Sequence, residues 1–299
     1  MRPSDPRFLE LAERGHGVVL LNQDGKRLRK RALVPVHRGV GRVRGAPLTF
    51  EQEVQAASLA VPGAAASHRT AGWKWGLEGI IPVGVELIIP HRMGSRRPGI
   101  IVHRSRTLER SDITRLGQIP ITNPMRTIID LAGVATPLSL ELALDDAYRR
   151  GLIRLDKLAS RLELLGHGCR GAGLLRALLL ERRDQPPTGS GLETKFFAAL
   201  RSMGLPRPVR QHDVYDDDGR WIANVDFAYP KLKIAIEIDG LKWHIGRKKF
   251  ESDHEKRIRL PGAGWYLLAF TQRMVEHTPG VVGAAVHKAF VEREGRNWV

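Results

Sequence analysis

The chain has 299 residues, of which 42% are hydrophobic and 27% charged, and its formal net charge is +16. This length allows two or three domains, and the composition is typical of a soluble globular protein. The positive charge favours an extended polyanion such as DNA or RNA as partner; the alternative is that basic residues are spread over every surface.

Cys169 is the single cysteine, which excludes an intramolecular disulfide framework and a cysteine-rich zinc site. The first thirty residues contain no signal-peptide core, and no apolar run approaches the roughly eighteen residues needed to cross a bilayer. We therefore expect a cytoplasmic protein with no membrane partner. The sequence predicts no particular oligomeric state.

Residues 1–45 carry eleven Lys or Arg against four acidic residues, a net charge of +7. A first helix is expected near Phe8 and should end near Gly15; a basic segment and a hairpin at Leu33–Val40 follow. This order is typical of a short winged helix that contacts DNA; the alternative is a basic, partly ordered arm that holds phosphates. The residues expected to contact DNA are Lys26, Arg27, Arg29, Lys30, Arg31 and Arg38.

Residues 46–184 predict a mixed α/β domain without internal repeats. Expected helices are Thr49–Val61, Ser67–Leu77, Pro124–Ala132, Ser139–Arg150, Leu155–Leu165 and Gly173–Arg182, and expected strands are Val83–Ile89 and Gly99–Val102. Residues 185–191 combine prolines, glycines and small polar residues, which is typical of a linker.

Residues 192–299 predict a third domain with the order αβββαβα. Its expected helices are Leu192–Met203, Lys248–Leu260 and Val281–Arg293, and its expected strands are Val209–Tyr215, Trp221–Tyr229, Lys233–Asp239 and Gly264–Phe270.

A group of acidic residues marks the middle strands of this domain. In Lys231–Asp239 apolar residues alternate with others, so Glu237 and Asp239 share the face opposite the isoleucines. Asp226 on the preceding strand reaches that face if the two strands pair. Three converging carboxylates repel one another unless a divalent cation neutralises them. With His244 nearby, they predict a metal-dependent phosphodiesterase site.

The element order, with Asp226 followed by Glu237-Ile238-Asp239, resembles the PD-(D/E)XK nuclease superfamily. More narrowly, residues 190–295 resemble the very-short-patch-repair (Vsr) endonucleases. The motifs that carry this likeness are Val225-Asp226-Phe227, Asp239-Gly240, Trp243-His244 and Asp253-x-x-x-Arg257-x-x-Leu260-x-x-x-Gly264-Trp265.

The resemblance implies a restriction-endonuclease-like fold and cleavage of DNA with Mg²⁺ or Mn²⁺. It makes Asp226 the central metal ligand, His244 the histidine that assists the attacking water, and Glu193 the helix acid that completes the site. Asp239 stands where the superfamily usually has a lysine, a place that Lys195, Lys242 or His244 could take. No zinc is expected, because the Vsr zinc ligands have no cysteine here.

The front of the chain resembles AbiEi-type antitoxins of type IV toxin–antitoxin systems, which pair a winged helix with an α/β domain. The likeness implies promoter binding and a cognate toxin as a second partner. It is carried by His37-Arg38-Gly39-Val40, Ser67-His68-Arg69-Thr70-Ala71, Val102-His103-Arg104-Ser105, Ile119-Pro120-Ile121-Thr122-Asn123-Pro124 and Asp130-Leu131-Ala132.

Each candidate residue also has a structural interpretation. Glu193 fits a capping box that begins at Ser190, Asp226 could pair with Arg220 or Lys233, and His244 could be a structural histidine. Glu237 and Asp239 could be solvated acids at the end of a strand. The other basic residues expected near the site, as a rim that faces phosphate, could instead only solvate their surroundings: Lys242, Lys248, Lys249, Lys256, Arg257 and Arg259. Four residues of the middle domain are expected to form structural hydrogen bonds: His68, Arg69, Arg126 and Asp130.

Together these observations predict a DNA-binding protein with a magnesium-dependent endonuclease domain, in which Asp226, Glu237 and Asp239 hold the metal. The alternative is a non-catalytic antitoxin or transcriptional regulator that uses a degenerate nuclease fold to bind DNA or a toxin.

Overall fold

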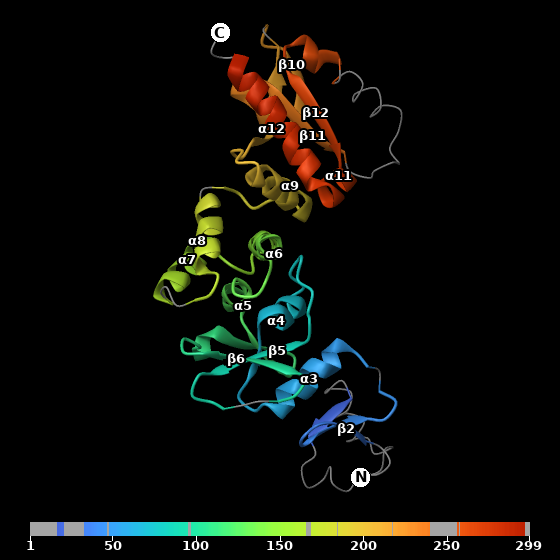
Figure 1. The fold of residues 1–299 in the computed structure, drawn as a ribbon, viewed down its shortest axis with the longest axis vertical. Coiled ribbons are helices and arrows are strands. Elements are labelled where there is room, and N and C mark those ends of the chain that lie inside the picture. The colour runs from blue at the N-terminus through green and yellow to red at the C-terminus, as the bar shows by residue number, and fades with distance from the viewer. Residues whose placement is uncertain are drawn as a thin grey trace. The chain divides into compact units, whose positions relative to one another are not determined.

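The computed structural model describes residues 17–20, 33–46, 48–94, 97–165, 169–183, 185–216, 218–239, 256 and 258–296. The chain folds as two compact units, Met1–Pro187 and Thr188–Val299 (Figure 1). Their boundary lies inside the 185–191 segment. The protein is a mixed α/β protein with several sheets, as the composition and periodicity predicted.

The first unit begins with a three-stranded sheet of order β1-β3-β2. Its strands are β1 (Val18–Leu20), β2 (Leu33–His37) and β3 (Val40–Val43), followed by helix α3 (Phe50–Ala60). The predicted hairpin is confirmed and turns at Gly39, whose φ of 82° favours glycine. Val18 and Val40 are buried in one cluster with Val54 of α3. The predicted helix near Phe8 and the basic segment 26–31 lie outside the described residues.

A five-stranded mixed sheet of order β6-β5-β4-β8-β7 forms the centre of this unit. Its strands are β4 (Ala65–Ala66), β5 (Val85–Pro90), β6 (Ile100–Ser105), β7 (Ile113–Leu116) and β8 (Ile119–Thr122). Strands β5 and β6 were predicted and pair in parallel. The β7–β8 hairpin and the two-residue β4 were not, because the alanines of β4 have no strand preference of their own and pair only in the tertiary fold.

Five helices complete the first unit, all in segments that the periodicity predicted. They are α4 (His68–Lys74), α5 (Pro124–Leu131), α6 (Pro137–Arg149), α7 (Leu155–Leu164) and α8 (Ala172–Glu181). Helix α6 begins two residues before the predicted start, because Pro137 fits the first turn and Thr136 caps it. Leu140, Leu144 and Leu158 lie fully buried where α5 to α8 pack together.

Two buried arginines tie this unit together through ion pairs. Arg182, 2% exposed, donates from Nε to Asp145 Oδ1 (2.5 Å) and from Nη2 to Glu141 Oε1 (2.7 Å). Arg126 donates from Nε to Asp130 Oδ1 (2.9 Å), and Arg69 and His68 also form hydrogen bonds with neighbouring side chains. The hydrogen bonds predicted for the middle segment are therefore confirmed.

The second unit has a four-stranded sheet of order β12-β11-β10-β9, in which β11 and β12 are parallel and the other pairs antiparallel. Its elements are α9 (Gly191–Ser202), β9 (Val209–Tyr215), β10 (Trp221–Tyr229), β11 (Ile234–Asp239), β12 (Tyr266–Thr271), α11 (Gln272–His277) and α12 (Pro279–Arg296). Helices α9 and α12 pack together on one face of this sheet, over Phe227 and Ile236 (Figure 1).

The second unit departs from the predicted order at two places. Helix α11 follows β12 directly because Thr271 caps it, with its hydroxyl accepting from Met274 N (3.2 Å). Strand β11 begins at Ile234 because Pro230–Leu232 form a 3₁₀ turn and Lys233 takes a left-handed φ of 47°. Of the helix predicted at 248–260, Lys256 and residues 258–260 are described, and they are helical.

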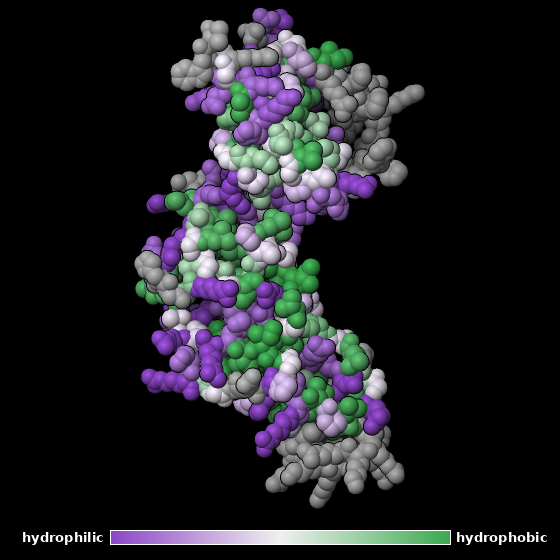
Figure 2. All heavy atoms as spheres, viewed as in Figure 1, coloured by the Kyte–Doolittle hydropathy of each residue, from purple (hydrophilic) through white to green (hydrophobic). Residues whose placement is uncertain are grey.

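Hydrophilic residues are common on the surface (Figure 2), as expected for a chain with many charged residues. On the face drawn in Figure 2, hydrophilic residues are spread over the described parts of both units. None of the described helices combines the length and the apolar character that a membrane crossing requires.

Candidate functional site

The two faces of strand β11 differ in what they contact. Ile234 and Ile236 pack into the cluster formed with α9 and α12, whereas Ala235 belongs to a second cluster with Leu260 and Trp265. Glu237 continues the Ala235 face because side chains alternate along a strand. The alternation predicted for this strand is confirmed, and its acidic face lies against the segment that contains Leu260.

Asp226 and Glu237 lie together at the end of the β10–β11 ladder. The backbone register pairs Phe227 with Ile236, so Asp226 faces Glu237 one residue further along. Their carboxyls are within hydrogen-bonding reach of each other. Asp226 Oδ2 also accepts the backbone N–H of Ile238 at 2.9 Å, which fixes its orientation. The two acids that the sequence singled out are therefore in contact.

Gln211 of β9 holds the other oxygen of Asp226. Its Nε2 donates to Asp226 Oδ1 at 3.3 Å, and it lies between the register pairs Val225–His212 and Phe227–Arg210. Gln211 has a φ of 45°, which is uncommon for a residue other than glycine inside a strand. Backbone outliers of this kind cluster at functional sites, where the surrounding structure holds them in place.

Lys256 supplies the positive charge of the site. Its Nζ donates to Glu237 Oε1 at 3.1 Å and to the carbonyl of Asn224 at 3.0 Å. The sequence offered Lys195 as one substitute for the missing lysine, but Lys195 pairs with Glu276 at 3.6 Å. The sequence placed Lys256 only in the basic rim. The signal that could have paired it with Glu237 is its spacing, since it lies one helical turn before the fully buried Leu260, on the same helix face.

The remaining predicted acids lie apart from this pair. Asp239 is exposed at the end of β11, and no described residue forms a hydrogen bond or ion pair with its side chain. Glu193 accepts the N–H of Gly189 (2.8 Å) and pairs with Arg210 (2.9 Å), so it serves the start of α9, but through Gly189 and not through the N–H of the cap residue Ser190 that the capping box predicted. Its carboxylate has no described contact with Asp226 or Glu237.

The alternative pairing of Asp226 across the hairpin is not found. Arg220 pairs with Asp218 at 3.3 Å, and Lys233 donates to the carbonyl of Ala263 at 3.2 Å. Arg38 is exposed in the turn of the β2–β3 hairpin. The other predicted site residues lie outside the described part of the chain: His244, Lys242, Lys248, Lys249, Arg257, Lys26, Arg27, Arg29, Lys30 and Arg31.

Comparison with known proteins finds similarity over part of the chain. No protein-family model matches the chain. An uncharacterized protein of Mycobacterium tuberculosis strain CDC 1551/Oshkosh and one of strain H37Rv are each 28% identical to it over 98 residues. The match covers 32% of this chain and 35% of each relative, so the chain spans about a third of the length of the curated relatives it matches.

Burial and charge perturb the protonation of Glu237. Burial raises the pKa of Glu237 to about 7, the ion pair with Lys256 opposes this rise, and the adjacent Asp226 carboxylate adds to it. A second negative charge on this pair of carboxyls is therefore unfavourable. Perturbed carboxyls of this kind are typical of functional sites.

The donor set fits a hard divalent cation. Mg²⁺ binds through one or two carboxylates and completes its coordination with water and substrate phosphate, so Asp226 and Glu237 are sufficient protein ligands. Among the residues that the structure describes, no group of three or more His, Cys, Asp or Glu is arranged to hold a metal. Within the described residues, the site is thus a carboxylate pair beside a lysine.

The raised pKa of Glu237 predicts a pH-dependent stability. Because the folded state holds this proton more tightly than the unfolded chain, the stabilisation is present below pH 4.5 and is lost as the pH rises through about 7. Between pH 5 and pH 8 the free energy of unfolding should fall by about 2–3 kcal/mol through this group.

The measurement is urea unfolding at several pH values for the wild type and Glu237→Gln. The difference between the two proteins isolates the titration of this carboxyl from that of all others. A difference that does not change between pH 5 and pH 8 would contradict the assignment.

Proposed function

We propose that the C-terminal unit hydrolyses phosphodiester bonds of DNA with Mg²⁺ or Mn²⁺. The observation that carries this proposal is the contact between Asp226 and Glu237 on adjacent strands, with Lys256 bonded to Glu237. Two acids and one lysine are the residue types of the PD-(D/E)XK nucleases that this part of the chain resembles. In this chain the lysine comes from the helix before β12 and occupies no position on β11.

Asp226 and Glu237 would hold the cation, which when bound neutralises charge on the scissile phosphate and makes a bound water more acidic. Asp226 is oriented for this task by the N–H of Ile238, which leaves its carboxylate little rotational freedom. The Lys256 ammonium keeps Glu237 in place and adds positive charge beside the phosphate position. The formal net charge of +16 favours a nucleic acid as the polyanion.

The test is cleavage of supercoiled plasmid by the purified full chain. Nicked or linear DNA should accumulate with Mg²⁺ or Mn²⁺ and not with excess EDTA, and a single-stranded RNA in parallel reactions tests substrate class. An Asp226→Asn protein purified in the same way controls for a contaminating nuclease. Equal cleavage by both proteins, or none in any metal, would overturn the proposal.

A second candidate is a non-catalytic regulator that grips DNA or a toxin partner. It is favoured by the exposed position of Asp239, which leaves two acids where three were expected. DNA binding without cleavage, together with calorimetry that detects no Mg²⁺ binding at millimolar concentration, would establish this function instead.

Replacing Lys256 should lower the rate of cleavage more than the affinity for DNA. Lys256→Gln removes the ammonium that fixes Glu237, and cleavage should fall by about tenfold to a hundredfold, as for residues that position metal ligands. Without this ammonium the pKa of Glu237 rises further, so the pH profile of the remaining activity should move to higher pH.

Lys288→Gln is the matched control, because Lys288 is 78% exposed and its ammonium lies 3.9 Å from Glu292. It should keep the wild-type rate and pH profile. A Lys256→Gln protein with a wild-type pH profile would show that Lys256 has no role in positioning Glu237.

A further inference from the structure

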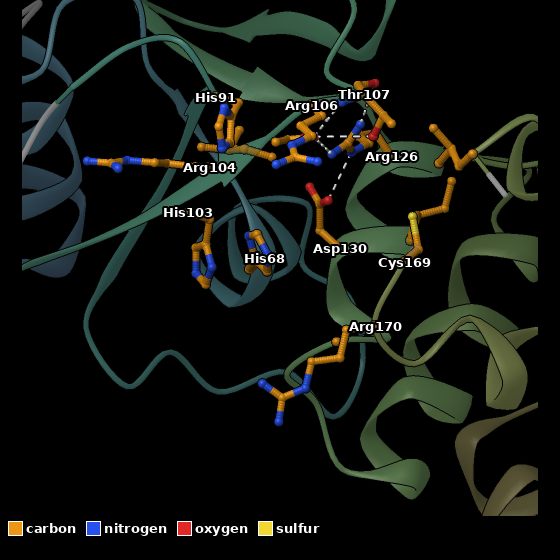
Figure 3. A pocket seen from close by; sticks show the side chains of 15 residues that line it. His68, His91, His103, Arg104, Arg106, Thr107, Arg126, Asp130, Cys169 and Arg170 are labelled. Carbon is orange, nitrogen blue, oxygen red and sulfur yellow. Dashed lines mark hydrogen bonds and ion pairs between the residues drawn. The ribbon is translucent and has the colours of Figure 1, made fainter. Parts of the chain in front are cut away.

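The first unit contains a cavity that the nuclease proposal does not use. It has a volume of about 520 Å³, within the range of small-molecule sites, and its lining comes from α4, β5, β6, α5 and from Leu165, Cys169 and Arg170 (Figure 3). Ile88, Ile129 and Leu165 form apolar parts of its wall. The remaining lining is largely cationic and aromatic.

Two stacked histidines form one side of the cavity. The rings of His68 and His103 are 3.5 Å apart between centroids and inclined by 17°. His103 Nε2 lies 3.2 Å from Glu86 Oε1, and His68 Nδ1 lies 2.9 Å from Ser67 Oγ. Burial lowers the pKa of His68 to about 2, so its ring stays neutral. The pair therefore offers a flat, fixed surface.

Asp130 brings an unpaired acceptor to the same cavity. Its Oδ1 accepts from Arg126 Nε at 2.9 Å, but its Oδ2 is buried and has no hydrogen-bond partner. In Figure 3 the Asp130 carboxylate extends from α5 toward Arg126. A buried acceptor without a donor is unfavourable, and a ligand that carries a hydroxyl or amino group would satisfy it.

Two arginines at the cavity form no ion pair within the part of the chain that the structure describes. Arg106 and Arg170 line it, are exposed, and form no hydrogen bond or ion pair with any described residue. Arg126 differs from them, because it is also bonded to Asp112 at 3.0 Å. Guanidinium groups bind phosphate through parallel hydrogen bonds, so the rim favours a phosphate monoester.

We propose that this cavity binds a 5′-phosphorylated nucleoside. In Figure 3 Arg106 and Arg170 lie on opposite sides of His68 and Asp130, so one of the two would hold the phosphate. Asp130 Oδ2 would accept from a sugar hydroxyl or a base amino group, and the apolar wall and the histidine pair would contact the base. The phosphate could belong to a free mononucleotide or to the 5′ end of a nucleic-acid strand. The proposal goes beyond the nuclease function and does not depend on it, since no residue is shared.

Calorimetry of the full chain with AMP, in EDTA so that no metal-dependent cleavage occurs, tests this site. AMP should bind with a stoichiometry of one, and adenosine and inorganic phosphate should each bind at least about tenfold more weakly, since each lacks one half of the contacts. Absence of AMP binding at millimolar concentration would overturn the proposal.

Charge-removing variants on the rim separate this site from other basic surfaces. Arg106→Gln combined with Arg170→Gln should weaken AMP binding by about tenfold or more, because the charge-assisted contact to the phosphate is lost whichever arginine makes it. Arg104→Gln is the matched control, since Arg104 also lines the cavity but its side chain leads away from His68 and Asp130 in Figure 3. An equal loss in the control would show nonspecific attraction and overturn the assignment.

Short DNA strands then identify the source of the phosphate. A 5′-phosphorylated strand that binds about tenfold more tightly than the same strand with a 5′ hydroxyl, and loses this preference in the double variant, identifies a strand end as ligand. No preference between the strands, with AMP binding intact, identifies the free nucleotide. Binding of both strands and AMP that the double variant leaves unchanged would contradict the site.

Discussion

Replacing Asp226 with asparagine should lower metal-dependent DNA cleavage by about 10²- to 10⁴-fold, since a bound metal supplies several kcal/mol of transition-state stabilisation. Asparagine removes the charge but keeps an oxygen that accepts the N–H of Ile238, now 2.9 Å from Asp226 Oδ2. The fold should therefore survive while the site loses its affinity for the cation. Initial rates of plasmid nicking, with Mg²⁺ binding measured by calorimetry, check both parts.

Asp218→Asn makes the same chemical change in an exposed turn of the same unit and serves as the control. It should cleave like the wild type. Removal of the Asp226 charge should also lower the pKa of Glu237, because the aspartate helps to raise it. An Asp226→Asn protein that retains both metal binding and cleavage would refute the site.

Replacing Arg182 with methionine should destabilise the first unit by about 3–5 kcal/mol, the usual loss when one partner of a buried ion pair is removed. Glu141 and Asp145, 0% and 1% exposed, would keep their negative charges in the interior without the guanidinium that now bonds both. For a unit of this size the melting temperature should fall by about 10 °C or more. Thermal unfolding at neutral pH measures the loss.

Arg154→Met is the control, because Arg154 pairs with Asp156 on the surface, where its side chain is 74% exposed and solvent screens the pair. If Arg182→Met unfolds at the wild-type temperature, the buried cluster does not stabilise this unit.

The sequence predicted what local patterns determine. The alternation around Ile236 placed Glu237 on the face away from the isoleucines, and the capping box placed Glu193 at a helix start. The β7–β8 hairpin was missed although its two strands are adjacent in sequence, with Leu116 paired to Ile119. Strand β4 could not be predicted, since its two alanines become a strand only through pairing with the distant β5 and β8. Tertiary pairing overrides weak local preference in such segments.

In the candidate site, too, one contact could be predicted from the sequence and another could not. The spacing of Asp226 and Glu237 suggested their contact, because paired strands bring opposite residues together. The partner of Glu237 did not follow from spacing along the strand, since Lys256 reaches it from a helix and lies nineteen residues further along the chain. Several basic residues cluster in that helix segment, and only the burial of Leu260 distinguishes the turn that faces the sheet.

The hydrogen bond from Ile238 N–H to Asp226 gives this aspartate a structural role in addition to the metal-binding role proposed for it. A descendant that lost hydrolysis would still gain stability from an acceptor at position 226, so retention of an acid or amide there would say little about activity. Glu237 differs from Asp226, because its ionised form destabilises the folded state at neutral pH. Under the proposed nuclease function, natural variation at position 237 is therefore a better indicator of activity than variation at position 226.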